Sequence, residues 1–126
     1  MKADAQDHLA RAEQLLELAE AIGEMGYAAD AIGRAYYAML HAARAVLLEL
    51  GVERSSHHGV WAAFGEHVAA PGLMNARYHR AGIQMFRARG ESDYVATPTD
   101  TREDAGEAIE IARDFVAACR AFIESR

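Results

Sequence analysis

The sequence has few of the features that stabilise small exported domains or that allow a helix to span a membrane. It has a single cysteine, Cys119, so no internal disulfide can form, which fits a reducing compartment. Only two prolines interrupt its 126 residues, and no apolar run approaches the roughly 18 residues of a membrane-spanning helix. The N-terminal segment is polar and amphipathic, without the apolar centre of a signal peptide. We therefore expect a cytoplasmic protein with no membrane segment.

Residues that favour helices dominate the chain, which is 52% hydrophobic and 25% charged. Apolar residues recur at intervals of three and four, and no segment alternates like a strand. A chain of this length is expected to form one domain, residues 1–126. The sequence therefore predicts an all-α, up-and-down bundle of about five helices. They should span roughly residues 4–22, 27–51, 57–68, 74–89 and 101–123.

Local signals also predict how these helices begin and end. Gly51 and Gly90 should end the second and fourth helices, and residues 91–99 should form a loop. A serine, either Ser55 or Ser56, should cap the third helix. The run from Asp100 to Glu103 has the pattern of a capping box for the last helix.

The segment from Ala31 to Gly51 carries the most informative pattern. Its apolar residues form an ordinary core stripe, but its opposite side carries a narrow row of polar residues at spacings of three, four and three. We call this row the polar line: Arg34, Tyr37, His41 and Arg44. Alanine and leucine separate these residues, where a side facing solvent would carry mixed charge. We therefore expect the polar line to face a cleft or a second subunit.

Charge is unevenly distributed along the chain, although the net charge is −6. Residues 1–30 contain two basic and seven acidic residues, and residues 91–126 contain four and nine, so each segment carries −5. Residues 31–90 contain seven arginines and three acidic residues, giving +4, together with five of the six histidines. If the middle helices line a cleft, that cleft attracts anions.

Three motifs carry a resemblance to a known family. They are RAYYAMLHAAR at residues 34–44, HHGVWAAFGEHV at residues 57–68 and RARGESDY at residues 87–94. Together they resemble the HEPN family of small helical prokaryotic proteins, most closely the branch encoded beside minimal nucleotidyltransferases. The likeness covers roughly residues 9–122. It implies the helical architecture derived above and a homodimer, which also fits a second helix that is apolar nearly all round.

The resemblance also implies roles for particular residues. Active HEPN ribonucleases carry an arginine followed four to six residues later by a histidine, and they cleave RNA without a metal. Here the fifth residue after Arg89 is Tyr94, preceded by Asp93. The catalytic candidates are therefore Arg89, Asp93 and Tyr94, with His41 as the alternative imidazole. The polar line and Arg87 would bind RNA or a nucleotide.

Each of these residues also has a structural interpretation. Arg89 falls on the apolar side of its helix, where it could cap helix carbonyls or pair with Asp93. His41 could pack in a helix interface, and His57 could simply mark the entry to the third helix. The histidines of that helix point in different directions, and no other set has metal spacing, so we expect neither a metal nor a cofactor.

Three functions remain open. The first is a toxin-type homodimer that cleaves RNA without a metal, in a two-component toxin–antitoxin system with a minimal nucleotidyltransferase. The second is a non-catalytic subunit that binds RNA, a nucleotide or the nucleotidyltransferase, which the missing histidine favours. The third is a structural dimer, which leaves Arg89 and the polar line unexplained. In related systems the partner adenylylates a tyrosine near the motif, so Tyr94 is the expected modification site unless it anchors the loop.

Overall fold

The computed structural model describes residues 1–93 and 95–126, without the side chains of residues 90–93. Its elements are α1 (Ala3–Glu24), α2 (Ala28–Glu49), α3 (His57–Phe64), the π-helical turn η1 (Gly65–Ala69), α4 (Ala76–Asp93) and α5 (Arg102–Glu124). The described residues contain no strand, so the prediction of an all-α fold with five helices is confirmed. None of the helices in these residues has the length and apolar character needed to cross a membrane.

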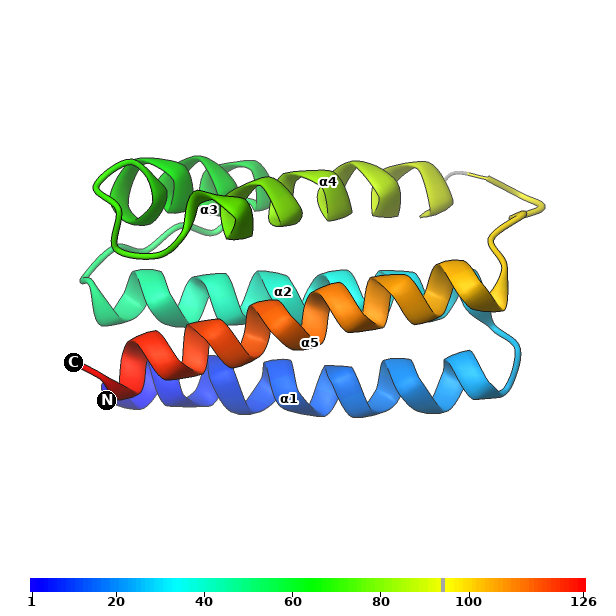
Figure 1. Ribbon diagram of the computed structural model, residues 1–126, viewed down its shortest axis with the longest axis horizontal. Helices are drawn as coiled ribbons and strands as arrows, with labels where there is room; N and C mark the ends of the chain where they lie inside the picture. The colour runs from blue at the N-terminus through cyan, green and yellow to red at the C-terminus, as the bar shows by residue number, and fades with distance from the viewer. Residues whose placement is uncertain (94) are drawn as a thin grey trace.

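The long helices α1, α2, α4 and α5 alternate in direction, and the fold is arranged around α2 (Figure 1). Helices α1 and α2 form an antiparallel pair, and α5 packs against both of them. Helices α3 and α4 cover another side of α2. This central position explains why α2 is apolar nearly all round, since it contacts every other α-helix of the fold, so this pattern does not by itself call for a second subunit.

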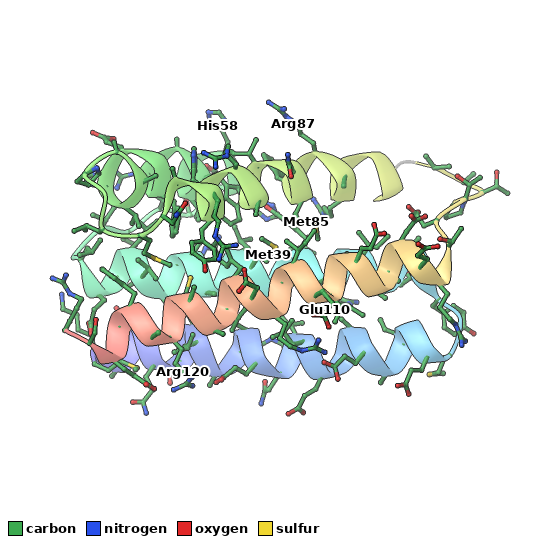
Figure 2. The ribbon with its side chains drawn as sticks, viewed as in Figure 1. Met39, His58, Met85, Arg87, Glu110 and Arg120 are labelled. Carbon is green, nitrogen blue, oxygen red and sulfur yellow. The ribbon has the colours of Figure 1, made fainter. Side chains whose placement is uncertain are left out.

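The core lies where the helices meet α2. Met39 of α2 is fully buried and lies opposite Met85 of α4 (Figure 2). Gly23 of α1 marks a close approach on the other side, because a Cβ built there would lie 3.5 Å from Cβ of Ala31 and 3.6 Å from Cδ1 of Ile109. The largest fully buried side chains are Trp61, Tyr36, Phe64 and Phe115. Cys119 is also fully buried, and burial raises the pKa of its thiol.

Several predicted helix ends are confirmed. Gly51 follows the end of α2 with a φ of 79°, a left-handed conformation that glycine adopts without strain. Ser56, rather than Ser55, caps α3, since its Oγ accepts from the Gly59 N–H at 2.9 Å. The third helix stops being regular at Phe64 and continues as η1, so its predicted extent holds but not its uniform geometry.

Two other predictions about helix ends are wrong. Gly90 does not stop α4, which continues to Asp93, so the loop predicted for residues 91–99 begins later. Glycine costs only about 1 kcal/mol in a helix interior, which neighbouring turns can offset. The last helix is capped by Thr101: its Oγ1 accepts from the Asp104 N–H, and its own backbone N–H donates to the Asp104 carboxylate. The capping box therefore lies one residue later than predicted.

Candidate functional site

The polar line lies along the strip of α2 between α1 and the α3–α4 pair, which we call the seam. His41 contacts His8 of α1, whereas Tyr37 contacts Arg89 of α4 and the ring of His57 of α3. Arg34 is exposed, and the other three members of the polar line are partly exposed. The seam is therefore a part of α2 that the neighbouring helices leave partly open, in an otherwise buried helix.

Arg89 points into the seam, as its position on the apolar side of its helix predicted. Its guanidinium donates to the Tyr37 hydroxyl at 2.5 Å. The same guanidinium carbon lies 5.0 Å from the Tyr37 ring centroid and 5.8 Å from that of Tyr36. Cations over aromatic faces are attracted by the ring quadrupole. Two adjacent tyrosines of α2 thus hold the charge of Arg89 at the middle of the seam.

Beside Arg89 lies a group of rings that we call the aromatic cluster: Tyr36, Tyr37, His57, Trp61 and Phe86. The Trp61 Nε1–H donates to the Tyr36 hydroxyl at 3.1 Å, and that hydroxyl also bonds Nδ1 of His57 at 3.1 Å. Tyr36 is fully buried and stacks on Phe86 at 5.8 Å between centroids. Burial is the main cause that raises the pKa of Tyr36. Its hydroxyl is therefore neutral and joins the core to the seam.

His41 belongs to a histidine pair. Its Nδ1 lies 2.9 Å from Nδ1 of His8, and the two rings stack at 5.1 Å. Burial lowers the pKa of His41 to about 4, helped by His8, Arg44 and Arg11. Burial and Arg44 also lower the pKa of His8, against Asp4 and Asp7. Both rings are thus neutral at pH 7, with one Nδ1 donating and the other accepting. The helix-interface interpretation of His41 fits this geometry, with His8 as the unforeseen partner.

Arg44 lies one turn beyond His41 on α2, and, together with burial, its charge lowers the pKa of both His8 and His57. It donates to the Ser55 carbonyl at 2.7 Å, and its Nε is buried without a bond from any described residue. With His8 and Arg54 it lines a pocket of about 360 Å³ whose apolar wall is formed by leucines of α2 and Val52. At the other end of the seam, Arg34 and Tyr37 line a smaller pocket of about 220 Å³. An arginine and an acidic residue therefore border each end of the seam: Arg44 with Glu53 in the larger pocket, and Arg34 with Asp30 in the smaller one.

The remaining predicted residues are not part of this arrangement. Arg87 is exposed and points away from the bundle (Figure 2). Tyr94 lies outside the described residues, and so does the side chain of Asp93, so their proposed roles stay predictions. No group of three or more histidine, cysteine or acidic residues in the described part of the chain is placed to hold a metal ion.

Sequence reasoning gave no functional role to His8 or His57, both of which the structure brings to the seam. His57 is the first residue of α3. The N-cap of this helix, Ser56, fixes the position from which the His57 ring projects. The HHG run could have indicated that one histidine lies at the seam, because only one of two adjacent histidines on a helix can face the bundle. His57 is partly buried, and His58 is exposed and points outward (Figure 2). His8 stands in a polar stretch of α1, and nothing in its local sequence marks it.

Fold and site together define a small all-α protein with a basic seam beside an aromatic cluster on its second helix. Its sequence matches the HEPN domain over residues 5–122. The chain therefore belongs to the HEPN domain family.

Relatives and a solved structure agree with this assignment. A UPF0332 protein of Gloeobacter violaceus is 38% identical over 94 residues, which is 75% of each chain. A Methanocaldococcus jannaschii protein named "Putative toxin MJ0605" is 34% identical over 105 residues, covering 83% of this chain and 78% of that one. The crystal structure of TT1696 from Thermus thermophilus superposes with a TM-score of 0.80 over 96% of this chain and 99% of its own, at 22% identity. This last likeness shows the fold alone.

Proposed function

We propose that the protein is the toxin-type component of a two-component toxin–antitoxin system and that it acts on RNA as a homodimer. Its activity is metal-independent RNA cleavage at the seam, and its partner is a minimal nucleotidyltransferase. The observation that carries this proposal is the Arg89 guanidinium, held against Tyr37 in the partly open seam. The relative whose name includes the word "toxin" supports the biological role.

A phosphodiester fits the chemistry of the seam. Arginine is well suited to phosphate, because its planar guanidinium presents several N–H donors with a permanent positive charge. Arg34 and Arg44 are ten residues apart on α2, which corresponds to about 15 Å along the helix. Arg89 reaches the seam between them, at Tyr37. Three positive charges along such a strip suit a single strand whose phosphates repeat every few ångströms.

The reaction we propose needs only the protein, the RNA and water. The 2′-hydroxyl passes its proton to water, the 2′-oxygen bonds to the adjacent phosphorus, and the bond from phosphorus to the 5′-oxygen breaks. The 5′-oxygen takes up a proton from water, which leaves a 2′,3′-cyclic phosphate and a 5′-hydroxyl. Arg89 stabilises the negative charge that grows on the phosphate oxygens, the kind of electrostatic effect that contributes most in many enzymes.

Cleavage of a short single-stranded RNA tests this activity directly. We expect cyclic-phosphate ends in the presence of EDTA, and a loss of at least about 100-fold in Arg89→Ala, as for removal of one stabilising donor. Arg87→Ala is the matched control, since Arg87 is on the same helix but points outward. Activity that EDTA abolishes and Mg²⁺ restores would contradict the mechanism. Full activity in a folded Arg89→Ala protein would do the same.

The assembly has its own test. The chain has a mass of 13.7 kDa, and we expect light scattering at micromolar concentration to give twice that value. A stable monomer would contradict the homodimer.

The partner is tested by co-expression with the neighbouring nucleotidyltransferase, followed by measurement of intact mass. We expect an added adenylate on wild type and none on Tyr94→Phe. An added phosphate near Arg89 would oppose the binding of a second anion. Adenylate that persists at full level in Tyr94→Phe would refute that site.

A non-catalytic role for the same seam is the second candidate, because Tyr94 stands where active HEPN ribonucleases carry histidine. In that case the dimer binds RNA or a nucleotide and presents it to its partner. RNA that binds in an Arg89-dependent manner but stays intact would favour this second role over the first.

A further inference from the structure

His57 has a ring whose proton position can be deduced from its neighbours. The indole Nε1–H of Trp61 can only donate, so the Tyr36 oxygen accepts from it at 3.1 Å. The Tyr36 hydroxyl is fully buried, and its own proton needs an acceptor. Nδ1 of His57, 3.1 Å away, is the acceptor that the described residues provide. A neutral His57 whose Nδ1 accepts must carry its proton on Nε2.

The surroundings of His57 keep this ring uncharged. Burial is the main cause that lowers its pKa, followed by the positive charges of Arg89 on α4 and Arg44 on α2. The other titratable groups that face it, Tyr36 and Tyr37, are phenols and bring no charge at neutral pH. The ring is therefore a neutral imidazole at pH 7, and no described residue bonds its Nε2.

His57 and Arg89 both lie against Tyr37 of α2. The His57 ring meets the Tyr37 ring edge-on with centroids 5.7 Å apart, and the Arg89 guanidinium carbon lies 5.0 Å from the same centroid. Ser56 caps α3 immediately before His57, and the stacked Tyr36 and Phe86 rings pack beside it. The neutral His57 ring and the Arg89 guanidinium thus lie against the same tyrosine ring, each carried by its own helix.

We propose that His57 donates its Nε2–H to the same phosphate that Arg89 binds. This inference rests on the proposed function, because it takes an RNA phosphodiester as the ligand of the seam. In this role His57 positions the phosphate and shares the charge that grows on its oxygens, and it does not remove the 2′-hydroxyl proton. A neutral donor fits this task next to two arginines, which would repel a third positive charge.

The proton position can be measured on the free protein. Long-range ¹H–¹⁵N correlation spectra at pH 7 distinguish a protonated ring nitrogen from a bare one. We expect His57 to show a protonated Nε2 and a bare Nδ1. A short 2′-deoxy oligonucleotide, which cannot react by 2′-hydroxyl attack, should then shift the Nε2 signal. A ring protonated on Nδ1 would overturn the proposal whatever the RNA assays show.

Substitutions of His57 can distinguish the role of a hydrogen-bond donor from that of a general base. The amide nitrogen of Gln can stand near Nε2 and donate, so His57→Gln should keep RNA affinity and cleavage within about 10-fold of wild type. His57→Leu cannot donate and should lose about 100-fold in cleavage, as for an oxyanion donor. His58→Leu is the control, because His58 is adjacent and exposed. Circular dichroism and thermal melting should show that His57→Leu is folded.

The outcomes distinguish this inference from the proposed function. Equal RNA binding and cleavage by His57→Leu and wild type, with Arg89→Ala impaired, would refute the role of His57 alone. Loss of cleavage in His57→Gln as severe as in His57→Leu would identify a base and refute the donor. A wild-type protein that binds no RNA would refute both proposals together.

Discussion

The two sides of α2 are held to their neighbours in different ways. Toward α1, small residues set the contact away from the His8–His41 pair, as at Gly23 and Ala31, and the alanines of α2 other than Ala28 and Ala29 are fully buried. Ion pairs on the surface join α5 to α1, among them Arg113 with Glu20. Toward α3 and α4, large rings set the contact, and their polar atoms bond to one another.

Away from the seam, the residues that face α1 contribute packing alone. Toward α3 and α4, the same side chains provide both the packing and the polar groups of the site. Exposed ion pairs contribute little to stability, so the surface pairs between α1 and α5 can change without affecting the seam. In the aromatic cluster, the hydroxyl of Tyr36 both satisfies buried Trp61 and orients His57. A substitution that moves one ring should therefore lower stability and disturb the site together.

The largest expected effect comes from Gly82→Ala in α4. A Cβ at this position would lie 2.2 Å from Cζ3 of Trp61, far inside van der Waals contact. Trp61 is buried and bonded to Tyr36, so it cannot move freely. We expect a loss of about 3 kcal/mol in the free energy of unfolding, at the upper end for overpacking, measured by urea denaturation.

Gly106→Ala on α5 is the matched control for that substitution. A Cβ there would meet nothing within 4 Å, so the change should raise stability by about 0.5–1 kcal/mol through the better helix propensity of alanine. If both substitutions were neutral, the contrast between the two sides of α2 would fail.

The second effect is a dependence of stability on pH that comes from the histidine pair. The folded-state pKa of His41 is about 4, below its ordinary value of 6.5, so the unfolded chain binds the proton more readily. The stability that this pair contributes is present above pH 6.5 and is lost as pH falls toward 4. We expect a loss on the order of 2 kcal/mol over this range. Urea denaturation of the variant carrying both His8→Gln and His41→Gln should show a flatter pH profile, and a profile as steep as that of wild type would exclude the pair.

The third effect is smaller and concerns the hydroxyl that links core and seam. Tyr36→Phe leaves the buried Trp61 N–H without its acceptor, which should cost about 1–2 kcal/mol. It also frees Nδ1 of His57, so the same variant should bind RNA more weakly. Tyr27→Phe provides the control, because Tyr27 is 56% exposed. A stability change in Tyr36→Phe no larger than in the control would argue against the bonded network.

The smallest effect is expected on the α1–α5 side. Arg113→Ala removes ion pairs with Glu20 and Glu110 on an exposed surface. Such pairs are screened by solvent, so we expect a loss of less than about 1 kcal/mol and no change in RNA binding. Weaker RNA binding in this variant would show that the two sides of α2 are not independent.

Much of the fold could be predicted from the spacing of apolar residues, and the limits of that reasoning have physical causes. Helix α4 continues beyond Gly90 because a single glycine costs a helix only a modest amount of free energy. That cost does not end the helix when the turns on both sides of it stay helical. The capping box shifted by one residue because Asp100 and Thr101 are both good caps, and only the geometry of the first turn selects between them.

The candidate site was predictable only in parts. Tyr37 and Arg89 were each identified from their positions on their own helices, but they are 52 residues apart in sequence, and their contact depends on how α4 lies against α2. His41 was identified, whereas its partner His8 lies on a helix whose polar residues look like an ordinary wet face. Local patterns predict which side of a helix a residue occupies, and only tertiary packing brings two such sides together.

The most direct test of the account is the salt dependence of binding to a short single-stranded RNA by wild type, Arg89→Ala and Arg87→Ala. Each lost phosphate contact should reduce the slope of log affinity against log salt by roughly 0.7. We predict that reduction, with weaker binding, for Arg89→Ala, and an unchanged slope for Arg87→Ala. Equal slopes and affinities for Arg89→Ala and wild type would contradict the claim that the seam of α2 binds RNA.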